Sequence, residues 1–99
     1  MKISIKNADI HPHIRARMQQ RGVSINEIEM TINKGWEAKD VKEGTIGRQF
    51  VFEYHAFWEG KYFEEKEVSV YYRYKDKSLI LLTVKARYGK DFKKGGKRK

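Results

Sequence analysis

The chain of 99 residues is 39% hydrophobic and 13% aromatic and carries a net charge of +9. These values fit one domain with a single core and exclude an intrinsically disordered chain. No cysteine is present, which excludes disulfides and thiolate zinc sites, and no apolar run resembles a signal peptide or reaches the roughly 18 residues of a membrane-spanning helix. We therefore expect a cytoplasmic protein with no membrane association.

A first helix is expected between Pro12 and Gly22. Asp9 or His11 can cap it, Pro12 stands in its opening turn, where a missing N–H group costs nothing, and Gly22 supplies the stop. Its apolar stripe consists of three residues spaced by four, Ile10, Ile14 and Met18. One face of this helix should therefore be buried and the others exposed.

A second helix is expected between Ser24 and Gly35. Ser24 as N-cap and Glu27 at the third helical position form a capping box. A second apolar stripe follows, made of Ile25, Ile28 and Ile32. Two short helices with one apolar stripe each should pack on a common layer.

The second half of the chain changes to a period of two, which is typical of strands. Residues 50–58 and 68–74 alternate in this way, with a hairpin turn expected at residues 59–60 and a second turn at 75–78. The continuous apolar run of residues 79–84 predicts a central strand covered on both faces, and a short edge strand is expected near residues 36–41. The predicted fold is α+β, with two N-terminal helices packed on one face of a mainly antiparallel sheet of about four strands.

Positive charge is concentrated at the C-terminal end. Residues 85–99 hold eight basic residues and one acidic residue, whereas the first 84 residues hold 14 basic and 12 acidic ones. We expect a single domain over residues 1–92 and a flexible basic tail over residues 93–99. Such a tail is typical of polyanion-binding proteins, although a tail that only improves solubility is the alternative. The tail residues expected to bind nucleic acid are Lys93, Lys94, Lys97, Arg98 and Lys99.

A row of basic side chains shares one face of the first helix. His13, Arg17 and Arg21 are spaced by four, and the helix itself holds no acidic residue. This arrangement favours an anionic partner. The alternative is that Arg17 or Arg21 pairs with a carboxylate elsewhere in the fold, such as Glu27 or Glu29.

Metal binding has weak support in the sequence. His11 and His13, with His55 as a third histidine, form no convincing ligand set, because zinc sites need three or four converging ligands. No glycine-rich phosphate loop, nucleophile elbow or other spaced enzyme motif is present. We expect no metal and no cofactor.

The expected sheet supplies further candidates, namely Arg48, His55, Tyr71, Arg73, Lys85, Arg87 and Tyr88. Alternation from Thr83 places Lys85 and Arg87 on one face. If these two residues and Tyr88 meet the basic face of the first helix, the site suits metal-free RNA cleavage. That reaction needs a group that deprotonates the 2′-hydroxyl, cations for the charged phosphorane, and an acid for the leaving oxygen. For most of the tyrosines, packing in the core or stacking is the alternative.

Residues 13–24 resemble a known signature. The pattern His-x-x-x-Arg-Met-x-x-Arg-Gly-Ile-Ser runs here from His13 to Ser24, with Val23 at the isoleucine position. It is the signature of a small domain-of-unknown-function family similar to the RelE/BrnT-like ribonuclease toxins, whose closing strand is similar to residues 79–88. The resemblance covers most of residues 11–92. It implies two helices, a sheet of about four antiparallel strands, and metal-independent cleavage of messenger RNA held in check by a protein antitoxin.

Together with the residue types, this resemblance implies roles for individual positions. The expected catalytic residues are His13, as general acid or base, with Arg17, Lys85 and Tyr88. The expected RNA-binding residues in the folded body are Arg21, Arg48 and Arg87, of which Arg48 would hold the scissile phosphate together with Arg17. The partners would be RNA, free or on the ribosome, and an acidic antitoxin. Two other functions stay open, a nucleic-acid-binding module without chemistry and a protein-interaction domain that receives an acidic partner.

Overall fold

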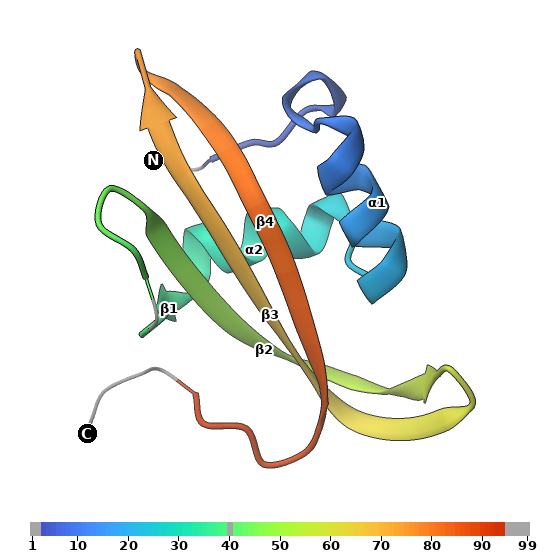
Figure 1. The fold of residues 1–99 in the computed structure, drawn as a ribbon. Coiled ribbons are helices and arrows are strands. Elements are labelled where there is room, and N and C mark those ends of the chain that lie inside the picture. Colours follow the sequence, from blue (N-terminus) through green and yellow to red (C-terminus); the bar gives the residue numbers. More distant parts are fainter. Residues whose placement is uncertain (1–2, 40, 95–99) are drawn as a thin grey trace.

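The computed structural model describes residues 3–39 and 41–94. Two helices precede an antiparallel sheet, which confirms the predicted α+β fold (Figure 1). The elements in chain order are a short 3-10 helix η1 (Asn7–Asp9), helices α1 (Pro12–Arg21) and α2 (Ile25–Lys34), and strands β1 (Trp36–Glu37), β2 (Ile46–Trp58), β3 (Lys61–Lys75) and β4 (Ser78–Gly89).

The four strands follow one another in space as they do in the chain. The order across the sheet is β1-β2-β3-β4, and every neighbouring pair is antiparallel. Helix α1 packs on β4 and α2 packs on β2 and β3, so both helices cover the same face of the sheet (Figure 1). Neither helix in the described part of the chain is long and apolar enough to cross a membrane.

The helix ends form as the sequence predicts. His11 is the N-cap of α1 and Pro12 its first residue, while the Asp9 carboxylate accepts a hydrogen bond from the Lys6 N–H at 2.9 Å instead of capping α1. Gly22 ends α1 in the left-handed conformation, at φ 71°. In α2 the capping box is present, because Ser24 Oγ accepts from the backbone N–H of Glu27 at 3.1 Å.

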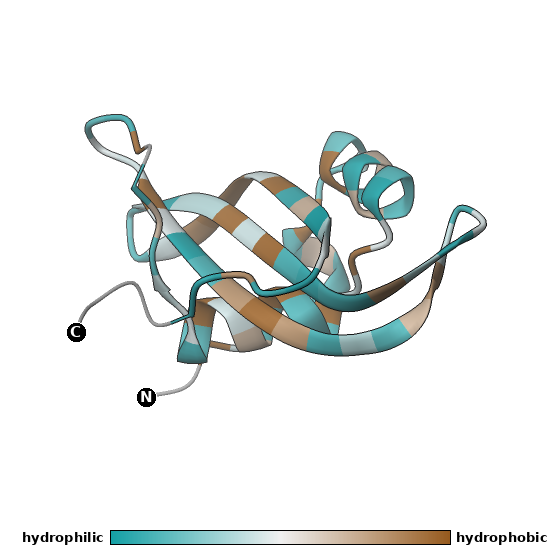
Figure 2. Cartoon of the chain, turned by 90° about the horizontal axis from the view of Figure 1, so that it is seen from below, coloured by the Kyte–Doolittle hydropathy of each residue, from teal (hydrophilic) through white to brown (hydrophobic). Residues whose placement is uncertain are grey.

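The apolar stripes of the helices meet the sheet in one core. Strands β2, β3 and β4 alternate between apolar and polar residues along much of their length (Figure 2). Burying these stripes is the main force that holds the helices on the sheet. The core cluster consists of Ile5, Ile10, Ile14, Met18, Val23, Ile28, Ile32, Val68, Val70, Tyr72, Leu81 and Val84.

The expectation that residues 79–84 form a central strand is wrong, because β4 is the last strand of the sheet and β3 lies between β2 and β4. A bulge explains the unbroken apolar run. Leu81 pairs with Tyr72 and Thr83 with Tyr71, so Leu82 is an extra residue in β4. The bulge turns both Leu81 and Val84 toward the helices, although residues three positions apart lie on opposite faces of a regular strand.

The remaining strand predictions hold with changes of length. The edge strand β1 is only two residues long, and its Trp36 pairs with Gln49 of β2. The predicted turn between β2 and β3 forms at Glu59 and Gly60, both with positive φ, as a tight hairpin turn requires. The pairing of β2 with β3 is interrupted between Glu53 and Ala56, and beyond this point the two strands form a projecting hairpin arm, residues 54–63 (Figure 1).

Candidate nucleic-acid interface

The face of the sheet opposite the helices, which we call the open face, carries an ordered array of polar side chains. Residues that pair across strands point to the same side of a sheet, so the register defines the array. Three rows cross β2, β3 and β4 in turn, and they are Gly47–Tyr71–Thr83, Gln49–Ser69–Lys85 and Val51–Glu67–Arg87. The open face is therefore polar along β3, although β3 is an interior strand of the sheet.

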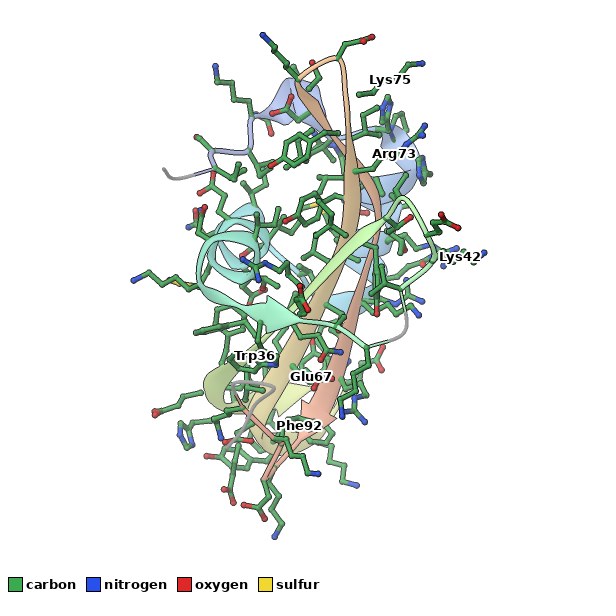
Figure 3. The ribbon with its side chains drawn as sticks, turned by 90° about the vertical axis from the view of Figure 1, so that its left-hand side faces the viewer. Trp36, Lys42, Glu67, Arg73, Lys75 and Phe92 are labelled. Atoms are coloured by element: carbon green, nitrogen blue, oxygen red, sulfur yellow. The ribbon has the colours of Figure 1, made fainter. Side chains whose placement is uncertain are left out.

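A cleft of about 780 Å³ lies over this array. Its floor includes Gln49, Glu67 and Arg87, and the C-terminal segment that follows β4 contributes to its lining through residues 91–94. Figure 3 shows Trp36, Glu67 and Phe92 gathered at one end of the sheet, whereas Arg73 and Lys75 lie toward the other. The cleft is lined by three aromatic residues, Trp36, Tyr71 and Phe92, and by four cationic ones, Lys39, Arg87, Lys93 and Lys94.

Glu67 and Arg87 form an ion pair in the cleft. Arg87 Nε donates to Glu67 Oε1 at 2.8 Å, and the carboxylate side chain is 8% exposed whereas the guanidinium side chain is 68% exposed. The hydrogen bond and the charge of Glu67 raise the pKa of Arg87 above its ordinary value, so Arg87 is a permanent cation. The pair thus presents a fixed positive charge to solvent beside a mostly buried carboxylate.

The neighbouring row adds an amide, a hydroxyl and an ammonium group. Gln49 Nε2 donates to Ser69 Oγ at 3.1 Å, which fixes the amide in the cleft. The Lys85 ammonium lies over the Tyr71 ring, 5.3 Å from its centroid. Lys85 and Arg87 therefore stand on adjacent rows of the same face, as the alternation from Thr83 predicts.

The C-terminal segment is held to the open face by Glu65. The Glu65 carboxylate accepts from the backbone N–H of Phe92 at 2.9 Å and from Lys94 Nζ at 2.6 Å. The hydrogen bond from Lys94 and then that from the Phe92 N–H lower the pKa of Glu65. The ring of Phe92 lies under the Arg87 guanidinium, with 4.9 Å between the guanidinium carbon and the ring centroid.

A different cluster occupies the helix-covered face at the same end of the sheet. Lys66 Nζ donates to the Gly22 carbonyl and to the Glu27 carboxylate, at 2.8 Å from Glu27 Oε1. The Tyr88 hydroxyl donates to the Arg21 carbonyl at 2.6 Å, and the Tyr88 ring stacks on Trp58 with centroids 4.9 Å apart. Burial is the main cause that raises the pKa of Tyr88, which holds its hydroxyl in the neutral form.

The structure divides the predicted catalytic residues between surfaces. Lys85 lies on the open face, opposite Ser69 of β3, whereas Tyr88 pairs with Lys66 and lies on the helix-covered side. His13 and Arg17 are exposed on α1. His13 stands eight residues, or about 12 Å along the helix axis, from the Arg21 carbonyl that Tyr88 contacts. The structure therefore brings Lys85 near Arg87 and places Tyr88 at the opposite end of α1 from His13.

The predicted RNA-binding residues are divided in the same way. Arg21 Nη1 donates to the Val84 carbonyl at 3.4 Å. Arg48 pairs with Val70, a core residue, and lies on the helix-covered side near Tyr72. Glu27 and Glu29, the carboxylates considered as arginine partners, instead accept from Lys66 Nζ and from the Ile5 N–H.

Of the tail residues, Lys93 and Lys94 line the cleft. Lys97, Arg98 and Lys99 lie outside the described residues. His55 lies in the interrupted part of β2 at φ 47°, with Nε2 3.7 Å from Glu53 Oε1. Within residues 3–39 and 41–94, no three histidine, aspartate or glutamate side chains gather as metal ligands do.

Several residues that line the cleft were not among the candidates from sequence, namely Trp36, Glu37, Lys39, Gln49, Glu67, Asp91 and Phe92. Glu67 follows Lys66 in an alternating strand, and only its pairing with Arg87 across the sheet distinguishes it from an ordinary surface glutamate. The turn at residues 75–78 alone gives a register one residue away from this pairing, because it does not include the bulge at Leu82. The period-two alternation along β3 and β4 was the signal in the sequence that could have identified Glu67.

A comparison with family models matches residues 10–85 to one family, described as Domain of unknown function (DUF4258), and the chain belongs to this family. The matched span includes both α-helices, strands β1 to β3, and β4 as far as Lys85. Arg87 and the C-terminal segment follow the matched span. No curated protein and no solved structure matches the chain.

Proposed function

We propose that this member of the DUF4258 family is a toxin-like, metal-independent endoribonuclease that acts on messenger RNA in the cleft of the open face. The observation that carries the proposal is the Glu67–Arg87 pair, with Nε and Oε1 2.8 Å apart, in a cleft that is also lined by aromatic rings. A carboxylate and a guanidinium in contact supply a base and a phosphate ligand within reach of one phosphodiester.

The cleft suits a single RNA strand on chemical grounds. Single strands bind where cations follow the phosphates and aromatic rings stack on the bases. Trp36 and Tyr71 supply rings, and Arg87, Lys93 and Lys94 supply charge. A ring next to a cation recurs at Tyr71 with Lys85, and at Phe92 with Arg87.

The proposed reaction is an internal transfer of the phosphoryl group. The Glu67 carboxylate takes the proton of the 2′-hydroxyl, the 2′-oxygen attacks phosphorus, and the bond from phosphorus to the 5′-oxygen breaks. The Lys85 ammonium gives its proton to that leaving oxygen, and Arg87 neutralises the charge that grows on the phosphorane. The products are a 2′,3′-cyclic phosphate and a free 5′-hydroxyl, after which solvent returns Glu67 and Lys85 to their charged forms.

The proposal includes a partner that restrains the enzyme. Residues 13–24 resemble the signature of a family similar to ribonuclease toxins, and this resemblance implies an antitoxin. The outer side of α1 offers such a partner a basic surface. Arg15 and Arg17 are exposed there, and α1 holds no acidic residue. An acidic protein or peptide would complement this surface.

The test is to incubate the purified full chain, without antitoxin, with a messenger RNA in EDTA. We expect shortened RNA with cyclic phosphate ends, and a loss of rate of at least a hundredfold in Glu67→Gln, because the amide cannot accept the proton. Glu64→Gln is the matched control, since Glu64 is exposed on the same strand, and it should retain the rate. His13→Ala in the same assay tests the role predicted for that residue. Intact RNA with the parent protein would contradict catalysis.

Binding without cleavage is a second candidate, and one observation favours it. Glu67 is only 8% exposed and already accepts a hydrogen bond from Arg87, as a purely structural carboxylate would. In that case the cleft would bind RNA with a steep dependence on salt, and neither the parent chain nor Glu67→Gln would shorten it.

A further inference from the structure

We infer that residues 91–94, which we call the C-terminal wall, hold the Arg87 guanidinium in place for the RNA phosphate, with Phe92 as the positioning residue. This inference rests on the proposed function of the same cleft. The basic C-terminal end of the chain then has two parts with different roles. The wall shapes the site, whereas the residues after it add general attraction to a polyanion.

Arg87 is held from two sides. Its Nε donates to Glu67 Oε1 at 2.8 Å, and its guanidinium carbon lies 4.9 Å from the centroid of the Phe92 ring. Among the described residues, no hydrogen bond engages the two Nη groups of Arg87. The carboxylate therefore fixes the inner edge of the guanidinium and the ring fixes one flat side, while the Nη donors stay free for a ligand.

Phe92 itself is fixed by contacts that do not involve Arg87. Its backbone N–H donates to Glu65 at 2.9 Å, and the same carboxylate accepts from Lys94 Nζ at 2.6 Å. Gly89 makes room for the ring, because a Cβ at that position would lie 3.1 Å from a ring carbon of Phe92. The segment is thus attached to β3 through Glu65 and closes against β4 at Gly89.

This arrangement matters because an exposed arginine otherwise samples many rotamers. Arg87 is 68% exposed, and aligning such a side chain with the phosphate in the transition state costs free energy. A guanidinium that is already ordered avoids this cost at the chemical step, where small misplacements slow a reaction strongly. Removing the ring should therefore act on the chemical step more than on attraction to RNA.

The experiment compares Phe92→Ala with a chain that lacks residues 95–99, in single-turnover cleavage and in binding of a non-cleavable 2′-deoxy strand. For Phe92→Ala, which keeps every charge, we expect cleavage at saturating RNA to fall by roughly tenfold to a hundredfold with little change in Kd. The shortened chain lacks Lys97, Arg98 and Lys99, so its Kd should rise and its salt slope should fall by about 2. Phe92→Tyr keeps the ring and should keep the rate.

A second measurement needs no RNA. In nitrogen-15 NMR, the Arg87 Nε–H should give a sharp signal that exchanges slowly with water in the parent chain and in Phe92→Tyr. It should broaden or be lost in Phe92→Ala. An unchanged signal and an unchanged saturated rate in Phe92→Ala would overturn the inference. If the parent chain cleaves no RNA but the Arg87 signal depends on Phe92, the proposed ribonuclease function fails while the positioning of Arg87 stands.

Discussion

Lys66 and Glu67 are neighbours in β3, yet they serve opposite faces of the sheet. Each is a mostly buried ionic group with a partner of opposite charge. On the helix-covered face the side chains of Lys66 and Glu27 are 3% and 22% exposed, whereas on the open face those of Glu67 and Arg87 are 8% and 68% exposed. The first pair keeps both charges within the packed structure, and the second keeps one charge in solvent, where a ligand can reach it.

This difference in exposure determines how much each ion pair can contribute to stability. Lys66 also donates to the Gly22 carbonyl, so one ammonium group ties β3 to the turn between the two helices. It further lies over the rings of Tyr54 and Tyr88, 5.6 Å and 5.5 Å from their centroids. Breaking a buried pair is costly because the remaining charge loses its partner, whereas a pair with an exposed member contributes little to stability.

The largest effect is expected on the helix-covered face. Lys66→Met should lower the free energy of unfolding by about 3 kcal/mol, because Glu27 and the Gly22 carbonyl lose their donor. Urea denaturation followed by far-ultraviolet circular dichroism measures this change. Lys61→Met, at an exposed lysine on the same strand, is the control and should leave stability nearly unchanged. If Lys66→Met were as stable as the parent chain, the ion pairs of the two faces would not differ in their contribution to stability.

A smaller change in stability is expected on the open face. Arg87→Ala should lower the free energy of unfolding by only about 1 kcal/mol, because the guanidinium is largely in solvent and its removal lets water reach the Glu67 carboxylate. The same variant should lose most of its affinity for RNA and its cleavage activity. Denaturation and RNA binding measured on one preparation separate the two effects. Strong destabilisation by Arg87→Ala would instead assign the Glu67–Arg87 pair to the structural framework.

The smallest effect concerns the attachment of the C-terminal wall and depends on pH. The hydrogen bonds from Lys94 and the Phe92 N–H lower the pKa of Glu65, so the attachment is complete at neutral pH and weakens only as the pH falls through that lowered value. The Phe92 amide signal in NMR should therefore titrate below the ordinary carboxyl range, with the core signals unchanged. Glu65→Gln should remove this titration. A Phe92 amide that does not respond to acid would argue against the attachment.

Local sequence patterns were sufficient for most of the fold. The capping box at Ser24, the left-handed Gly22 and the turn at Gly60 depend on neighbouring residues only, and all three are present. The position of β4 could not be predicted in this way. Its apolar run fits a central strand equally well, and the structure explains the run by the packing of α1 and the extra residue Leu82.

The candidate site was less accessible to prediction, since it depends on pairing across the sheet. Lys85 and Arg87 follow from alternation within one strand, and both lie on the open face. Glu67 required the register of β3 against β4, which the bulge shifts by one residue. Phe92 required knowledge that the chain folds back after β4, and that contact is made by Glu65, 27 residues earlier in the sequence.

The order of elements along the chain also has a consequence for synthesis. The helices leave the ribosome first, but Val68, Val70, Leu81 and Val84, which cover the stripes of Ile14 and Ile28, come from the last two strands. Lys66, the donor for the turn between the helices, follows 44 residues after Gly22. Both apolar stripes therefore stay uncovered until β3 and β4 have been made, and the chain passes through a stage in which it is open to chaperones or to association with other chains.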